Sequence, residues 1–443
     1  MGYGDIGPFG SKLNRTPNLD RMAAEGVKLT SFYAAPVCTP SRAQMMTGCY
    51  AKRVSMPNVI FPSCPTGLST QEKTVAALLK ARGYATMCIG KWHLGDQPEF
   101  LPTQHGFDHY LGLPYSNDMG GPVRPAKGKG KVGRRPPPPL PLVQDAQVIE
   151  APADQSKLTA RYTREAVKFI TANKDRPFFL YFPHTAVHVP LHPGEAFAGK
   201  SANGAYGDWV EEVDWSVGRV LAALRDLKLE RNTLVLFTSD NGPWLTQGKN
   251  GGVAGPLRGG KGSTWEGGMR EPTIAWWPDK IPAGTVCDAP ASEIDVLPTL
   301  VRLAGGDVPT DRVIDGRDIW PLMAGQSQQS PHEALFYFNG NQLQAVRCGP
   351  WKLAIAPQSE ATAKKSPPIP ASLESPRLYN LDSDLGETTD VAAQHADVVK
   401  RLQGHVAKMD ADLGVKGVGP GVRPCGRVEN PKPLLMRSAA EYD

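Results

Sequence analysis

Residues 27–47 read VKLTSFYAAPVCTPSRAQMMT, and this stretch identifies the kind of fold. Residues 27–33 mix apolar, β-branched and aromatic side chains in a way that predicts a strand. Ser41 to Thr47 predicts the start of a helix, so Cys38 falls at a strand-to-helix turn. Open α/β sheets place their binding sites beyond the carboxyl ends of strands. Cys38, followed by Arg42, therefore lies where a functional site is expected.

The same alternation of strands and helices continues through the first 325 residues. Helix signals include Pro17 after Thr16 and a capping box from Ser69 to Glu72. Predicted helices span 17–25, 69–83, 158–171, 208–227 and 291–304, and predicted strands span 84–89, 177–182, 233–238 and 273–277. Apolar strands between helices indicate an α/β fold, with a mixed, mostly parallel sheet between helices.

The pattern changes after about residue 325. Strand-like pieces at 334–338, 344–347, 351–355 and 377–379 precede a predicted helix at 391–413. This order favours a small antiparallel sheet with one helix. We therefore expect two domains, an α/β catalytic domain over residues 1–325 and a C-terminal α+β subdomain with a tail over residues 326–443.

Composition excludes several classes of protein. The 443 residues are 40% hydrophobic and 21% charged, which are globular values. The net charge of +5 comes without a nucleic-acid-binding motif, so no nucleic-acid partner is expected. No stretch approaches the ~20 apolar residues of a membrane span. The seven cysteines lack metal-ligand spacing; those other than Cys38 either form disulfides or stay reduced and buried.

Polar side chains follow several of the predicted strands, at the edge where parallel strands end. These candidates are Lys91, His93, His184, Asp240 and Asn241, with Lys261 in a Gly-rich loop. Cations can bind an anion and a histidine or lysine can donate a proton. The carboxylate and amide oxygens of Asp240 and Asn241 suit Ca²⁺ or Mg²⁺.

Each candidate also has a plain structural interpretation. Lys91 and His93 could belong to an ordinary polar loop, and Asp-Asn-Gly is a common turn. His184, His188 and His192 recur every four residues, as in a helical metal site. Prolines at 183, 190 and 193 argue against a helix there. The basic segment 120–143, with six Lys or Arg and no acid, is expected to be an exposed loop.

Taken together, the motifs resemble one family. The segments CTPSR (38–42), GKWHLG (90–95), PYS (114–116), TSDNG (238–242) and GKGSTWEGGMREP (260–272) occur in the order seen in the formylglycine-dependent type I sulfatases. The sequence is most similar to arylsulfatase A and the N-acetylgalactosamine-6-sulfatases. LYNL at 378–381 extends the resemblance to nearly the whole chain. It implies an alkaline-phosphatase-like fold.

The resemblance implies a role for each motif residue. Cys38 becomes formylglycine, whose hydrated form is the nucleophile, and Arg42 holds it. Lys91 and Lys261 bind sulfate with help from Ser116, and His184 lies near the leaving oxygen, so that Lys261 or His184 is the proton donor. His93 contacts the hydrated nucleophile and helps to eject sulfate. Asp240, Asn241 and the formylglycine at position 38 ligate Ca²⁺, with Mg²⁺ as an alternative.

The resemblance also implies partners. These are a sulfated small molecule or glycan as substrate, and a formylglycine-generating enzyme. The basic segment 120–143 is then either a linker or an arm that attracts a sulfated polyanion. Two alternatives stay open: a phosphodiesterase or phosphonate hydrolase of the same superfamily, and a non-catalytic relative that binds sulfated glycans.

The start of the sequence departs from the family pattern. In the family, a first strand ends in two aspartates that bind the metal, directly before a GYGD segment. This sequence begins with Met1 followed by GYGD. We therefore expect that the start codon was assigned too late, so that a signal peptide, the first strand and the aspartate pair lie upstream of Met1; a natural truncation is the alternative. A signal peptide there would suggest an exported protein. With Asp240 as the one evident carboxylate ligand, Ca²⁺ would be held weakly.

Overall fold

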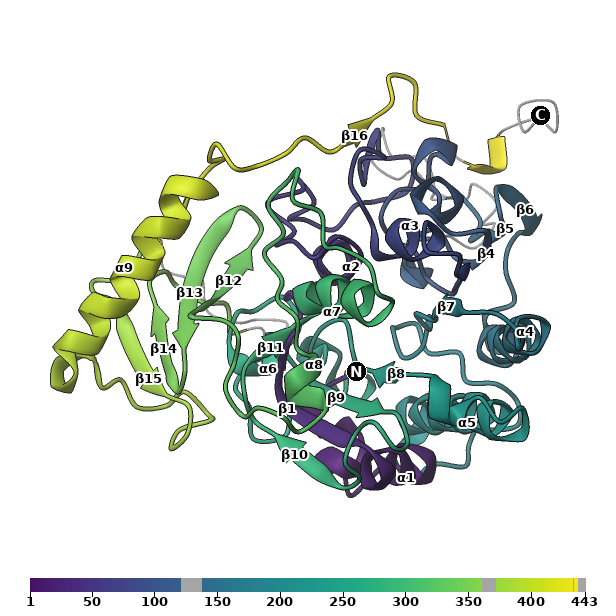
Figure 1. Ribbon diagram of the computed structural model, residues 1–443, viewed down its shortest axis with the longest axis horizontal. Helices are drawn as coiled ribbons and strands as arrows, with labels where there is room; N and C mark the ends of the chain where they lie inside the picture. The colour runs from purple at the N-terminus through teal and green to yellow at the C-terminus, as the bar shows by residue number, and fades with distance from the viewer. Residues whose placement is uncertain (121–137, 361–371, 433, 437–443) are drawn as a thin grey trace, which may run out of the picture.

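The computed structural model describes residues 1–120, 138–360, 372–432 and 434–436. Two five-stranded sheets form the larger part of the molecule (Figure 1). The first has the order β10 (Thr285–Cys287), β1 (Val27–Tyr33), β9 (Arg270–Trp276) and β8 (Val235–Phe237), with β11 (Ala291–Ser292) also on β1. The second has the order β6 (Gln147–Glu150), β5 (Leu142–Gln144), β4 (His109–Gly112), β3 (Ala85–Ile89) and β7 (Phe178–Tyr181).

Helices cover both faces of these sheets, as the sequence predicts. On one face lie α1 (Pro17–Glu25), α4 (Leu158–Ala172) and α5 (Gly204–Asp226), which pack on one another. On the other lie α2 (Cys38–Thr47), α3 (Val75–Lys80) and α7 (Val296–Leu303) (Figure 1). The α/β class is confirmed. The sheet is more mixed than its apolar strands suggest, because β9 runs antiparallel to both β1 and β8.

The C-terminal part contains the expected antiparallel sheet. Its order is β12 (Leu335–Asn339), β13 (Gln342–Cys348), β14 (Trp351–Ala354) and β15 (Arg377–Asn380). Helix α9 (Ala396–Asp412) packs on β13 and β14. The short α6 (Glu266–Met269) and α8 (Trp320–Met323) precede this part, and β16 (Gly426–Arg427) returns to pair with β2 (Thr66–Gly67).

Two predicted helices have other bounds in the structure. The helix expected over 69–83 begins at Val75, because the Thr74 hydroxyl accepts a hydrogen bond from the Ala77 N–H at 3.1 Å and caps it. The helix expected over 291–304 is preceded by β11 and a short turn, Glu293–Asp295, and becomes helical only in α7. A capping side chain sets the start of α3, whereas α7 continues from the turn that Ser292 and Asp295 close.

The segment 120–143 is only partly described. The basic residues of the predicted arm fall within 121–137, which lie outside the described residues. Its end differs from the exposed loop that the sequence predicts, because Leu142 and Val143 are buried in β5. All seven cysteines are described and are free thiols. None of the helices in the described ranges has the length and apolar character to cross a membrane.

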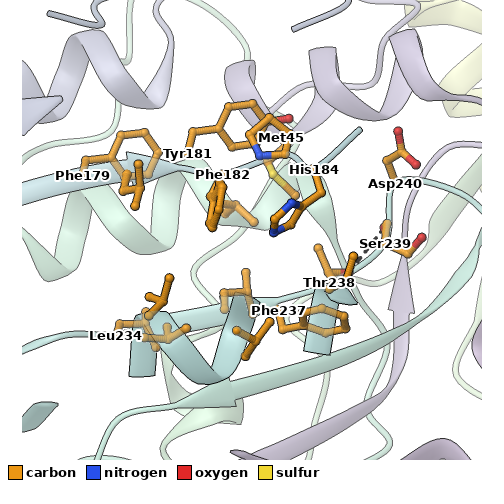
Figure 2. Close-up of a pocket in the computed structure, with 18 of the residues that line it drawn as sticks. Met45, Phe179, Tyr181, Phe182, His184, Leu234, Phe237, Thr238, Ser239 and Asp240 are labelled. Atoms are coloured by element: carbon orange, nitrogen blue, oxygen red, sulfur yellow. Dashed lines mark hydrogen bonds between the residues drawn. The ribbon is translucent and has the colours of Figure 1, made fainter. Parts of the chain in front are cut away.

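A cavity of about 830 Å³ separates the two sheets. It lies between β7, the last strand of one sheet, and β8, the last strand of the other. Figure 2 shows Phe179 and Tyr181 of β7, Phe237 of β8 and Leu234, which directly precedes β8, around this space. Polar residues such as Arg42, Lys91 and Asp240 line its other end, beyond the carboxyl ends of the strands.

Candidate active site

Cys38 is the first residue of α2 and lies directly after the extended Val37. Its side chain is buried, with 3% of the residue exposed. The turn before it is fixed by Ser41, whose hydroxyl accepts a hydrogen bond from the Ala35 N–H at 2.9 Å. The helix thus begins three residues earlier than the sequence suggests. Cys38 lies at a helix N-terminus, where backbone N–H groups favour negative charge.

Arg42 connects Cys38 to two strand ends. Its Nη2 donates to Asp240 Oδ2 at 2.7 Å, and its Nη1 donates to the Lys91 carbonyl oxygen. Burial alone would raise the pKa of Asp240, but Arg42 and Lys91 hold it well below its usual range. Asp240 is therefore ionised, and its charge allows the Arg42 guanidinium to be buried.

Lys91, Ser116, His188 and Lys261 form a continuous chain of polar contacts. Lys91 Nζ donates to Ser116 Oγ at 3.2 Å, and Ser116 Oγ lies 3.4 Å from His188 Nδ1. Lys261 Nζ donates to His188 Nε2 at 2.7 Å. Burial lowers the pKa of Lys91. Burial, Lys261 and Lys91 lower the pKa of His188 to about 2, so the ring is neutral.

These contacts place His188, and not His184, beside Lys261. His184 Nε2 instead lies 3.2 Å from Ser216 Oγ on α5, and its ring packs against Phe182. Figure 2 shows His184 at the end of β7, facing the space between β7 and β8. The sequence interpretation put His184 near the leaving oxygen, and that role stays a prediction; the structure brings His188 into contact with Lys261. The chain turns irregularly after Pro183, so residue spacing could not decide which histidine faces the lysines.

His93 lies behind Cys38 in a backbone conformation that is uncommon for a side chain of its kind, with φ of 63°. Its carbonyl oxygen accepts a hydrogen bond from Thr39 Oγ1 at 3.1 Å, and its Nε2 lies 2.9 Å from the Ile60 carbonyl oxygen. Burial, then Lys91 and Arg42, lowers the pKa of His93 well below its ordinary value. Its Nδ1 has no hydrogen-bond partner among the described residues.

Asp240 and Asn241 do not by themselves complete a metal site. Asp240 Oδ1 accepts from Asn241 Nδ2 at 2.7 Å, while Oδ2 is engaged by Arg42. In the described parts of the chain, no three His, Cys, Asp or Glu residues are grouped so that they could hold a metal ion. Since Ca²⁺ takes six to eight oxygen ligands, the residues present do not fit the ion without further ligands.

Trp244 is a site residue that the sequence interpretation missed. Lys261 Nζ lies 4.5 Å from the centre of its ring, and the His188 ring lies 5.3 Å away. The indole thus forms an aromatic wall beside the two groups, with a cation–π contact to Lys261. Its position after Asp240 and Asn241 in the chain was the one available signal.

The assembled site is suited to an anion. Three cations, Arg42, Lys91 and Lys261, line the polar end of the cavity together with a single ionised aspartate. Fixed positive groups of this kind stabilise negative charge that develops on a tetrahedral oxyanion. The neutral ring of His188 accepts the Lys261 hydrogen bond and so directs this ammonium group.

Comparison with known proteins gives a consistent picture. The profile of the Sulfatase family matches residues 1–306, and that of the C-terminal region of aryl-sulfatase matches residues 330–419. Arylsulfatase A of Homo sapiens is 40% identical over 93% of this chain and 86% of its own length. N-acetylgalactosamine-6-sulfatase of Sus scrofa is 43% identical over 80% of this chain and 69% of its own. A solved sulfatase from Pseudoalteromonas sp. superposes with a TM-score of 0.82 and 28% identity, over 93% of this chain and 88% of that one.

Proposed function

The chain belongs to the sulfatase family, and on that premise we propose that it hydrolyses the sulfate ester of a sugar or aryl alcohol through an oxidised Cys38. Sulfate ester hydrolysis as such follows from the family. The observation that carries the finer proposal is the position of Cys38, at the start of α2 and beside Arg42, with Lys91 and Lys261 lining the same cavity.

Formylglycine at position 38 would supply a hydrated aldehyde that attacks sulfur. Arg42 suits this group, because the two side chains at 38 and 42 are close enough to interact electrostatically. Arg42 Nε and His93 Nδ1 are buried nitrogens without a hydrogen-bond partner among the described residues, and hydroxyl groups would satisfy them. This supports the roles that the family resemblance implies for both residues.

The remaining residues bind sulfate and move protons. Lys91 and Lys261 bind its non-bridging oxygens, and Ser116 supports Lys91 through its 3.2 Å contact. Lys261 is the proton donor to the leaving alcohol, because it carries the proton in its hydrogen bond to the neutral His188. His188 thus takes the place that the sequence interpretation gave to His184, and orients Lys261.

Ca²⁺ is the cofactor that the resemblance implies, with Mg²⁺ as an alternative. The side-chain oxygens of Asp240 and Asn241 would contribute to its binding, together with the group at position 38. Because these ligands alone do not satisfy the ion, we assign no step of the reaction to it. The substrate is a sulfated small molecule or sulfated glycan, and a formylglycine-generating enzyme is the partner that would modify Cys38.

One experiment tests the proposed nucleophile. The chain is co-expressed with a formylglycine-generating enzyme, the peptide around residue 38 is analysed by mass spectrometry, and aryl sulfate hydrolysis is measured. We expect aldehyde at position 38, and activity that is lost in Cys38→Ala but kept in Cys64→Ala, a partly buried cysteine outside the site. Full activity of Cys38→Ala would refute the proposal. Faster cleavage of an aryl phosphodiester than of aryl sulfate would favour a phosphodiesterase instead.

A further inference from the structure

The segment that carries Lys261 is joined to the nucleophile side of the site by its backbone. The Lys261 N–H donates a hydrogen bond to the Pro243 carbonyl oxygen at 2.9 Å. The next N–H, that of Gly262, donates to the Pro36 carbonyl oxygen at 2.8 Å. Pro36 lies in the turn that leads to Cys38. The backbone around the lysine is thus bonded directly to the turn before α2.

The other side of the same segment is bonded to the C-terminal sheet. Asn339, the last residue of β12, donates through Nδ2 to the Gly262 carbonyl oxygen at 3.1 Å. The Thr264 hydroxyl donates to Gln344 Oε1 of β13 at 2.7 Å, and the Thr264 carbonyl oxygen accepts from Lys352 Nζ of β14 at 2.8 Å. Neighbouring strands of this sheet therefore hold the residues that follow the lysine of the site.

Gly262 is the point where the two sides meet. Its N–H donates to Pro36 and its carbonyl oxygen accepts from Asn339, so this residue is bonded to both parts of the molecule. Its φ of 87° lies in the left-handed region that glycine adopts readily. Within the described ranges, Asn339 provides the one hydrogen bond to this carbonyl oxygen. Without the Asn339 amide, the peptide after Gly262 would be free to turn, and the Lys261 segment would lose a fixed point.

The hairpin that carries Asn339 is itself held in place. Asn339 pairs with Gln342 where β12 turns into β13, and Gly340 in the turn has a φ of 58°. The carbonyl oxygen of Asn341, in the same turn, accepts a hydrogen bond from Lys52 Nζ at 2.7 Å. Lys52 is buried and follows α2 in the chain. The hairpin is therefore fixed to the catalytic part of the molecule beyond the end of α2.

We propose that Asn339 is a positioning residue of the active site, which acts through Gly262 on the Lys261 ammonium group. The lysine side chain is long and flexible, so its reach depends on where its backbone is held. A misplacement of about 1 Å can lower a rate by roughly 10²-fold. The inference rests on the proposed role of Lys261 as proton donor. It gives the C-terminal subdomain a part in the reaction in addition to its packing.

The test compares aryl sulfates whose leaving phenols differ in acidity. A proton donor matters more for phenol than for the more acidic 4-nitrophenol, which leaves readily as an anion. With the chain co-expressed with a formylglycine-generating enzyme, we expect Asn339→Ala to lower kcat/KM for phenyl sulfate by about tenfold or more, and for 4-nitrophenyl sulfate by less than about threefold. Asn339→Asp, which keeps the shape and loses the donor, should behave alike. Asn341→Ala, an exposed neighbour in the same turn, is the matched control and should change neither value.

A double variant separates positioning from a general loss of structure. If Asn339 acts through Lys261, adding Asn339→Ala to Lys261→Ala should lower kcat/KM for phenyl sulfate by less than about twofold. An equal loss in both backgrounds would overturn the inference. Equal losses for the two substrates in both Asn339 variants, with a lowered urea midpoint, would assign Asn339 to folding alone and overturn it as well.

The Lys261→Ala variant shows whether the proposed donor fails together with this inference. If its loss is larger for phenyl sulfate than for 4-nitrophenyl sulfate, while the Asn339 variants show no such difference, the inference alone is overturned. If Lys261→Ala itself lowers kcat/KM for both substrates equally, the proposed donor is wrong, and the inference falls with it. A larger loss for phenyl sulfate in both the Lys261 and the Asn339 variants supports the inference.

Discussion

His188 is the histidine whose surroundings match a role in sulfate ester cleavage. It accepts the Lys261 hydrogen bond at 2.7 Å, while His184 contacts Ser216 on a structural helix. We predict that His188→Ala lowers kcat/KM for an aryl sulfate by about 10²–10⁴-fold, the range for loss of general acid catalysis, because Lys261, the proposed proton donor, loses the ring that orients it. The loss of kcat/KM in His184→Gln should be at least tenfold smaller than the loss in His188→Ala. A larger loss in the His184 variant would return the role to that residue.

At this scale, the sequence could predict which residues meet but not how each is oriented. Arg42, Lys91 and Asp240 were expected together because each follows a strand end or the turn after it, and the structure brings them into contact. His184 and His188 both follow β7, in a segment without regular structure. Their directions depend on packing against α5 and the lysine loop, which residue spacing does not encode.

Strand β14 is attached to the catalytic part of the molecule by a buried lysine. Lys352 Nζ lies 3.0 Å from Glu266 Oε1 of α6 and 2.7 Å from Glu387 Oε1, and all three side chains are 0% exposed. Burial alone would raise the pKa of Glu266, but Lys352 and Arg347 hold it below its usual range. Removing the lysine would take away the ion-pair partner of Glu387 and leave Glu266 with Arg270 and Arg347, at 3.5 and 3.9 Å.

We therefore predict that Lys352→Met destabilises the protein by about 3–5 kcal/mol, as expected when one partner of a buried ion pair is removed. Urea unfolding measures this change. Lys157→Met is the matched control, because Lys157 pairs with Asp154 at the exposed surface and its loss should leave the midpoint unchanged. Equal midpoints for the two variants would contradict the assigned importance of the buried pair.

Element types were predictable from the sequence, whereas their starts were less so. The apolar spacing of α5 and of α9 predicts helices close to those observed. Helix α3 begins later than predicted because Thr74, and not Ser69, provides the cap. The Ser69 hydroxyl accepts only a local hydrogen bond from Gln71, within a turn. A capping pattern indicates a start that tertiary packing can move.

For the molecule as a whole, buried neutral histidines predict a loss of stability in acid. Burial lowers the pKa of His105 from 6.5 to about 4 in the folded state. The folded state therefore binds fewer protons than the unfolded state between these values, and stability falls as the pH drops from 6.5 toward 4. A shift of this size corresponds to about 3 kcal/mol.

This expectation is checked by unfolding His105→Phe and the unaltered chain in urea across pH 4 to 8. The variant should lose less stability in acid, with a slope smaller by about one proton. Phe is chosen because the ring packs near Trp92 in the core, at 5.6 Å between ring centres. Parallel curves for the two proteins would show that His105 titrates normally in the fold.

The order of strands is the part of the whole fold that the sequence could not reveal. The alternation of strands and helices predicts the α/β class, but the antiparallel direction of β9 depends on contacts far along the chain. The cavity between β7 and β8 likewise depends on contacts between residues far apart in the chain.

The burial of Cys38 also restricts when the proposed oxidation of its side chain could take place. With 3% of the residue exposed and its backbone already inside α2, the thiol is out of reach of another enzyme's active site once the chain has folded. If Cys38 is oxidised as proposed, the modifying enzyme would have to meet residues 38–42 as an unfolded peptide, during or soon after synthesis. Each molecule would become active only if Cys38 were modified before folding. Molecules that folded with an unmodified Cys38 could not be activated later.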